Sequence, residues 1–360
     1  MPLDHYVTLG RSGLRVSPFA LGAMTFGEDP GGAGCSVEES EKILKAYLSR
    51  GGNFVDTANF YTNGHSEAIL GDFFAGNRGL RDRVVIASKF FGNLFPGDPN
   101  GGGAGRRSII NQLNETLRRL QTDYLDLYWL HQWDRNTPVE ETMRTLDDLV
   151  QAGKIRYIGF SNTPAWVTTQ AHTMAVLRGW SPLIALQVEY SLLAREVEGE
   201  LAPFALDQGL ALVPWSPLKN GFLSGKYKRG TEVADSVRTT YVGGPSGSEF
   251  DVIETVAAVA KELNSTSAAV ALAWLRARKG TVVPVLGARR LEHLESNLAG
   301  LDVSLTPEQL NTLDEVSTPT LNYPAPMHGA LRAMLQFAGA TVDGEASAVY
   351  PPLVQSDVRY

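Results

Sequence analysis

Four polar residues could carry chemistry, because each one lies near the end of a short apolar segment or closely follows such an end. Asp56 stands near the end of NFVDT, Lys89 ends VVIASK and His131 ends YLDLYWLH, while Tyr61 follows Asp56 by five residues. If these segments are adjacent parallel strands, their carboxyl ends meet at one edge of the sheet, where ligands bind. The sequence therefore predicts a carboxylate, a phenol, an ammonium and an imidazole in one site.

These side chains are suited to delivering a proton to a substrate oxygen. A tyrosine hydroxyl has an ordinary pKa of about 10, and a nearby ammonium lowers it by stabilising the phenolate. Lys89 is the candidate ammonium, and Asp56 can hold it charged and in place. His131 can orient a carbonyl oxygen. We therefore predict that Tyr61 is the general acid while hydride reaches the carbonyl carbon, a reaction that needs no metal ion.

Each of the four residues also has a purely structural interpretation. Asp56 precedes a threonine and could cap a helix, and Tyr61 could be a packing aromatic. Lys89 could be solvated at a strand end, and His131 could be a hydrogen-bonded core histidine. The catalytic interpretation is favoured only because all four side chains are predicted to lie at the same edge of one sheet.

The elements that would position these residues form a repeating unit of apolar strand followed by helix. The eight apolar runs span residues 19–24, 53–57, 84–89, 124–131, 155–162, 183–190, 210–217 and 281–288. Helical patterns separate them; one has Thr137 as its expected N-cap, Pro138 at its first position and Gly153 as its stop. Such units predict a (β/α)8 TIM barrel.

We expect one barrel domain over residues 1–326, with an N-terminal β-hairpin in residues 1–18 and a C-terminal tail in residues 327–360. The alternative is an open doubly wound sheet. That fold would place G-x-G-x-x-G after its first strand, but TFGEDPGGAG follows it here. The glycine-rich stretch 91–107 is predicted to be a mobile lid or a substrate wall.

Composition limits the classes of partner. The net charge is −7 over 360 residues, which argues against non-specific nucleic-acid binding. Apolar runs are too short to cross a membrane, and the N-terminal stretch has no secretion-signal pattern. The single cysteine, Cys35, allows no intramolecular disulfide. We expect a cytoplasmic protein that acts on small molecules, with a homo-oligomer as one possible assembly.

Several blocks resemble the aldo-keto reductase superfamily, and most closely its bacterial and potassium-channel-β-subunit-like branches. The blocks are GGNFVDTANFYTNGHSEAILG, VIASKF, LDLYWLHQWD, GKIRYIGFSN, LQVEYSLL, VPWSPLKNGFLSGKY and VPVLGARRLEHLESN. The resemblance runs from about Tyr6 to Pro324 in unbroken order. It implies that the family's catalytic Asp, Tyr, Lys and His are Asp56, Tyr61, Lys89 and His131.

The resemblance also implies NADPH/NADP+ as cofactor. The residues that it assigns to the cofactor, from the nicotinamide to the adenosine, are Ser161, Asn162, Gln187, Trp215, Ser216, Pro217, Leu218, Lys226, Arg238, Gly287, Arg289, His293, Ser296 and Asn297. Three positions depart from the family pattern. Thr62 replaces a usual glycine, and His293 and Ser296 replace a common Gln and Glu near the adenine.

The implied activity is reduction of aldehydes or ketones to alcohols, or the reverse oxidation of secondary alcohols. Phe26, Phe60, Phe91 and Trp133 are the predicted substrate-binding aromatics. Two other functions stay open. One is a redox-sensing or ancillary binding subunit with slow turnover. The other is a metal-dependent barrel hydrolase, which the scattered histidines and the ligand-free first strand disfavour.

Overall fold

The computed structural model describes residues 2–28, 34–230 and 243–355. Its centre is an eight-stranded parallel sheet in the order β10-β3-β4-β5-β6-β7-β8-β9. The strands are β3 (Ala20–Gly22), β4 (Phe54–Asp56), β5 (Val85–Phe90), β6 (Leu125–Leu130), β7 (Ile155–Ser161), β8 (Leu183–Glu189), β9 (Ala211–Trp215) and β10 (Val285–Gly287). A parallel bridge between Leu212 and Val282 joins the two ends of the sheet. The predicted (β/α)8 barrel is confirmed.

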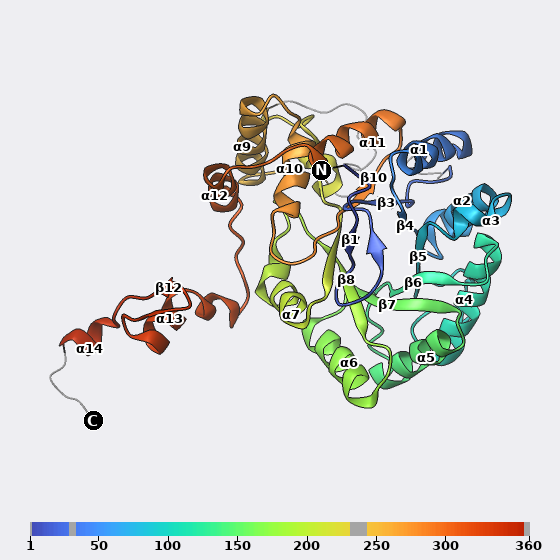
Figure 1. Ribbon diagram of the computed structural model, residues 1–360, viewed down its shortest axis with the longest axis horizontal. Coiled ribbons are helices and arrows are strands. Elements are labelled where there is room, and N and C mark those ends of the chain that lie inside the picture. Colours follow the sequence, from blue (N-terminus) through green and yellow to red (C-terminus); the bar gives the residue numbers. More distant parts are fainter. Residues whose placement is uncertain (1, 29–33, 231–242, 356–360) are drawn as a thin grey trace.

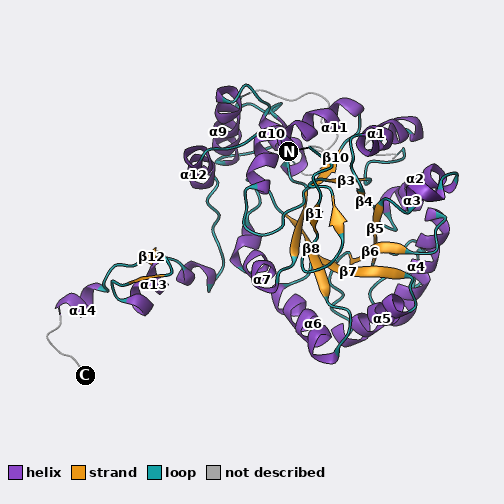
Figure 2. Cartoon of the chain, in the orientation of Figure 1, coloured by secondary structure: helices purple, strands orange, loops and turns teal. Residues whose placement is uncertain are grey.

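Helices surround the strands on the outside of the barrel (Figures 1 and 2). They are α1 (Val37–Ser49), α2 (His65–Ala75), α3 (Arg78–Arg81), α4 (Arg106–Leu120), α5 (Val139–Gln151), α6 (Ala165–Arg178), α7 (Leu201–Gln208), α9 (Glu249–Glu262), α10 (Ser267–Arg276), α11 (Leu291–Leu298) and α12 (Pro307–Val316). Short 3-10 turns are η1 (Tyr61–Gly64), η2 (Glu196–Gly199), η3 (Lys219–Ser224) and η4 (Ala299–Leu301).

The start of α5 corrects one expectation. Pro138, not Thr137, occupies the N-cap position, and no side chain caps the helix there. The Thr137 hydroxyl instead donates to Asp134 at 2.7 Å. The Thr137 hydroxyl, which the sequence predicted would cap the helix, is therefore bonded to the Asp134 carboxylate. The helix still begins directly after Pro138.

The alternation of side chains along each strand determines which residues reach the barrel interior. Phe54, Val85, Ala87, Leu127 and Trp129 belong to one inner cluster, whereas their strand neighbours pack outward against the helices. Because successive strand residues point to opposite faces, the inward set continues two positions beyond Phe54, Ala87 and Trp129, at Asp56, Lys89 and His131. That rule directs the polar ends of β4, β5 and β6 into the mouth of the barrel.

The inner cluster is packed closely enough to require glycine at one point. A Cβ on Gly159 would lie 2.2 Å from the ring of Trp129, so the β7 backbone leaves room for that indole. The N-terminal hairpin, β1 (Val7–Thr8) with β2 (Arg15–Val16), adds Leu9 and Val16 to the same cluster. The hairpin therefore covers the end of the barrel opposite the strand C-termini.

The glycine-rich stretch 91–107 is hydrogen-bonded to the barrel near both of its ends, and its role as a mobile lid or a substrate wall stays a prediction. The Gly103 N–H donates to the Phe91 carbonyl at 2.9 Å, and the Ala104 N–H donates to Asp134 at 2.9 Å. The side-chain amide of Asn59 donates to the Gly92 carbonyl at 2.7 Å. These bonds anchor both ends of the loop to the barrel.

After α12 the chain leaves the barrel and forms a projecting tail (Figure 1). The tail contains η5 (Ala325–His328), α13 (Ala330–Phe337), a hairpin of β11 (Thr341–Val342) and β12 (Glu345–Ala346), and α14 (Pro351–Gln355). The domain boundary at residue 326 stays a prediction. Within the described ranges, no helix has both the length and the apolar character to span a membrane.

A buried ion pair joins α2 to α4 beneath the site. The Nε of Arg119 lies 2.7 Å from Glu67, whose side chain is fully buried, and the Ser88 hydroxyl donates to the other carboxylate oxygen. Burial raises the pKa of the Glu67 carboxyl, and Arg119 opposes that rise. Removing one partner of such a pair leaves an uncompensated buried charge, which costs about 3–5 kcal/mol.

We therefore predict that Arg119→Met lowers the free energy of unfolding by about 3–5 kcal/mol near neutral pH. Without Arg119 the pKa of Glu67 rises further. The loss should therefore shrink as the pH falls through that pKa and Glu67 becomes neutral. Urea unfolding at several pH values measures this. Arg118→Met is the control, because Arg118 is exposed and pairs with Glu115 on the same helix. Equal losses in the two variants would contradict the prediction.

Candidate active site

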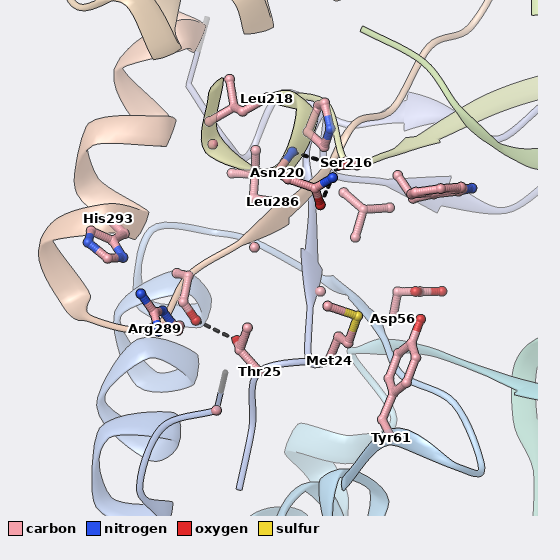
Figure 3. Close-up of a pocket in the computed structure, with 18 of the residues that line it drawn as sticks. Met24, Thr25, Asp56, Tyr61, Ser216, Leu218, Asn220, Leu286, Arg289 and His293 are labelled. Carbon is pink, nitrogen blue, oxygen red and sulfur yellow. Dashed lines mark hydrogen bonds between the residues drawn. The ribbon is translucent and has the colours of Figure 1, made fainter. Parts of the chain in front are cut away.

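A cavity of about 1070 Å³ opens at the carboxyl ends of the strands. Figure 3 shows Asp56, Tyr61 and Met24 at one end and Arg289 with His293 at the other. Ser216, Leu218 and Asn220 lie along the wall between these ends (Figure 3). The volume suits a ligand larger than a single small substrate, because pockets for drug-sized ligands occupy about 300–1,000 Å³.

Lys89 connects the polar residues at the first end of the cavity. Its side chain is fully buried at the end of β5, and its Nζ donates to Asp56 Oδ2, to the Thr57 carbonyl at 2.7 Å and to Tyr61 Oη at 3.1 Å. The other Asp56 oxygen accepts from Gln187 at 3.0 Å. Every Nζ hydrogen therefore has a partner, and the ammonium points at the phenol.

The charges at this end favour a positive Lys89 and a protonated Tyr61. Burial alone would lower the pKa of Lys89, but Asp56 and then Tyr61 hold it above its usual value. Burial raises the pKa of Tyr61, and the nearby Lys89 only partly offsets that rise. The expected net lowering of the Tyr61 pKa is therefore wrong, because burial outweighs the ammonium. At neutral pH the phenol still has its proton to give.

His131 faces Tyr61 across the same end of the cavity. Their ring centroids are 5.8 Å apart at an angle of 82°, and Phe60 lies 5.1 Å from the imidazole. Burial, followed by the Lys89 ammonium, lowers the pKa of His131 to about 3. Within the described residues its buried Nδ1 has no hydrogen-bond partner. The imidazole is thus neutral and can donate one hydrogen bond without adding a charge.

The turn that holds Tyr61 explains the usual glycine at position 62. Thr62 has φ 49° and Asn63 has φ 55°, so both adopt the left-handed conformation. This conformation costs roughly 1–2 kcal/mol for a residue with a Cβ, which is why glycine suits it. The Thr62 hydroxyl donates to the Phe26 carbonyl at 2.9 Å, which offsets part of that cost.

Most residues assigned to the cofactor line the cavity. They are Asn162, Gln187, Trp215, Ser216, Pro217, Leu218, Lys226, Gly287, Arg289, His293, Ser296 and Asn297. Ser161 lies buried at the end of β7, and its hydroxyl has no partner among the described residues. Arg238 falls outside the described part of the chain.

Asn162 also has a structural role that the sequence did not indicate. It has φ 47°, its amide nitrogen donates to the His131 carbonyl at 3.0 Å, and its amide oxygen accepts from the Trp215 indole at 3.0 Å. The amide therefore links the Trp215 ring to the backbone of His131, the residue that follows β6. A left-handed asparagine is well tolerated at such a point.

The far end of the cavity is rich in positive charge. Burial lowers the pKa of His293, and Arg290, Arg289 and Lys226 lower it further. Arg289 follows β10 and Lys226 follows η3, so segments far apart in sequence meet here. In the described residues, no group of three or more His, Cys, Asp or Glu could hold a metal ion.

The four predicted substrate-binding aromatics do not all reach the cavity. Phe60 lines it and is 43% exposed, but Phe26 is completely buried in the core. Phe91 packs against that core. Trp133 pairs edge-to-face with Trp166 at a separate hollow of about 220 Å³. Side chains beyond a strand end no longer follow the strand alternation, so the sequence could not place them.

Other wall residues were missed. Met24 is 52% exposed and points toward the Tyr61 end, and Glu28 and Asn63 also line the cavity. Met24 was open to prediction, because it closes the first apolar run.

The low pKa of His131 can be tested directly. We predict that its imidazole stays neutral between about pH 8 and pH 5, where an ordinary histidine gains a proton. NMR of ring-labelled protein measures this, with His131→Gln used to assign the signal. A midpoint near the ordinary value of about 6.5 would contradict the buried, lysine-facing position.

Comparison with known proteins places this arrangement in a family. The profile of the aldo/keto reductase family matches residues 18–318. The chain is 34% identical to the aryl-alcohol dehydrogenase [NADP(+)] of Phanerodontia chrysosporium, over 88% of this chain and 86% of the relative. It is 35% identical to the aldo-keto reductase ausK of Aspergillus calidoustus, over 88% and 83%. It is 31% identical to the norsolorinic acid reductase of Aspergillus flavus, over 89% and 82%.

The buried lysine between a carboxylate and a phenol, the barrel that carries it and these matches agree. The chain belongs to the aldo/keto reductase family and is an enzyme of the oxidoreductase class.

Proposed function

We propose that this enzyme uses NADPH to reduce aryl aldehydes or ketones to alcohols, or runs the same reaction in reverse. One observation carries the proposal: Lys89 joins Asp56 to Tyr61 at one end of a long cavity whose other end is cationic. The first end suits proton transfer to a substrate oxygen. The second end suits the phosphates of a dinucleotide.

The residues of the cavity fit a nicotinamide dinucleotide. The buried Ser161 hydroxyl has no partner in the part of the chain that the structure describes, so it is available to a carboxamide. Trp215 offers a ring held in place by Asn162, and Ser216–Leu218 would follow the pyrophosphate. Lys226, Arg289 and the neighbouring side chains would hold the adenosine end. When bound, NADPH supplies the hydride that reaches the carbonyl carbon.

The chain's own residues supply the proton. Tyr61 donates its hydroxyl proton to the carbonyl oxygen, and Lys89, 3.1 Å away, stabilises the phenolate that remains. Asp56 and the Thr57 carbonyl fix the ammonium, and Gln187 fixes Asp56. The neutral His131 donates to the same oxygen and sets its direction. No member of the set has to change position during the transfer.

Apolar and aromatic side chains favour a ring-bearing substrate. Phe60, Met24 and Trp215 surround the Tyr61 end of the cavity. Phe60 also stacks beside His131, which leaves a flat apolar surface next to the reacting oxygen. The name of the Phanerodontia relative, an aryl-alcohol dehydrogenase that uses NADP(+), supports the same substrate class and cofactor.

An ancillary or redox-sensing subunit with slow turnover is the alternative function. Steady-state turnover on reactive aryl aldehydes separates the two. The cytoplasmic location, the homo-oligomer and the potassium-channel-β-subunit-like branch stay predictions from the sequence.

We predict that Tyr61→Phe reduces the turnover number by about 10²–10⁴ while leaving the dissociation constant for NADPH nearly unchanged, because only the proton donor is lost. Tyr128→Phe is the matched control. The Tyr128 hydroxyl is buried and has no partner among the described residues, so its removal should leave turnover intact. Near-normal carbonyl reduction by Tyr61→Phe would show that another group donates the proton.

A further inference from the structure

A negative charge lies next to the adenosine end of the cavity, on a residue, Glu39, that does not itself line it. Glu39, in the first turn of α1, accepts the backbone N–H of Leu291 through Oε1 at 2.8 Å. Leu291 is the first residue of α11, and no side chain of its own N-cap residue, Arg290, caps that helix. A carboxylate from a residue 252 positions away therefore occupies the start of the helix.

The segment that leads into α1 borders the same wall. Thr25 and Gly34 line the cavity, and the Thr25 hydroxyl donates to the Ala288 carbonyl at 2.6 Å. The α1 helix is also tied to α11 by the ion pair of Arg50 with Glu295 at 3.0 Å. These contacts fix the position of Glu39 relative to the residues that follow β10.

Glu39 and Arg289 act on a common neighbour. The thiol of Cys35 is half-buried, and burial is the main cause of its raised pKa. Among the charged groups, Glu39 raises that pKa and Arg289 lowers it. The carboxylate and the guanidinium thus both lie near this thiol, so their fields overlap around it.

This geometry changes what the start of α11 can offer a phosphate. A helix N-terminus favours anions through its N–H groups, but here one of those groups is already bonded to a carboxylate. A fixed carboxylate repels a nearby phosphate through its charge, whereas an uncharged ribose hydroxyl is not repelled. NADPH carries a phosphate at the 2′ position of the adenosine ribose, where NADH has a hydroxyl.

We propose that Glu39 determines cofactor selectivity by weakening the binding of the 2′-phosphate of NADPH relative to the 2′-hydroxyl of NADH. The proposal rests on the proposed function, in which the cavity binds a nicotinamide dinucleotide. Arg289 and its cationic neighbours attract the phosphate, and Glu39 limits how strongly they do so. The enzyme therefore binds NADPH less tightly than its cationic residues alone would allow.

The test compares dissociation constants for NADPH and NADH, measured by quenching of tryptophan fluorescence, in the wild type and in Glu39→Gln. Glutamine keeps an oxygen for the Leu291 N–H and removes only the charge. We expect the dissociation constant for NADPH to fall roughly three- to thirtyfold and that for NADH to change less than about twofold. Added salt should shrink the difference between the two proteins.

Glu38→Gln is the matched control, because it removes the same charge from the same turn of α1. Its side chain is 80% exposed and pairs with Lys42 at 2.8 Å, on the outer face of the helix. We expect both dissociation constants to stay at wild-type values. Melting temperatures of the variants show whether the cap of α11 has survived.

The outcomes separate this proposal from the proposed function. An unchanged ratio of the two constants in Glu39→Gln, an equal change in Glu38→Gln, or weaker NADPH binding in Glu39→Gln would overturn the role of Glu39. Arg289→Ala should weaken the binding of NADPH and leave the binding of NADH unchanged, which tests the proposed dinucleotide site independently of Glu39. A wild type that binds neither dinucleotide would overturn the proposed function and this inference together.

Discussion

The site depends on a lysine that is kept charged inside the barrel. Moving an ammonium and a carboxylate out of water costs several kcal/mol per ion, and only close pairing with further hydrogen bonds offsets this. Lys89 meets that requirement with three acceptors, and Asp56 meets it with Lys89 and Gln187. The pair gains little stability for the fold. What it provides is a fixed positive charge against the oxygen of Tyr61.

The surrounding structure maintains that charge in place. The two-residue period of β4 and β5 turns Asp56 and Lys89 inward, and parallel pairing brings the two strands side by side. The left-handed turn at Thr62 and Asn63 follows Tyr61 directly, and the Tyr61 hydroxyl lies 3.1 Å from Lys89 Nζ. The buried Glu67–Arg119 pair supports the turn from below, since a Cβ on Gly64 would lie 3.0 Å from the Arg119 side chain. Asn162 then couples His131 to the ring of Trp215.

The sequence was sufficient for the barrel and for the meeting of Asp56, Lys89 and His131, because both follow from local periodicity and strand order. It was not sufficient for contacts between distant segments. The bonds of Gln187 to Asp56 and of Leu291 to Glu39 span 131 and 252 residues and leave no local pattern. Nor could it give the direction of the Tyr61 pKa shift. That depends on how deeply the finished fold buries the phenol.

The claim that Lys89 acts through Tyr61 is tested most directly by a double-mutant cycle on turnover with saturating NADPH. The four proteins are the wild type, Lys89→Met, Tyr61→Phe and the double variant, each shown to be folded by circular dichroism. If the ammonium serves the phenol, residues acting as one unit should be strongly non-additive. Lys89→Met should then slow the wild type markedly but change the Tyr61→Phe enzyme by less than about threefold. A double variant whose fold loss in turnover equals the product of the two single losses would contradict the claim that Lys89 acts through Tyr61.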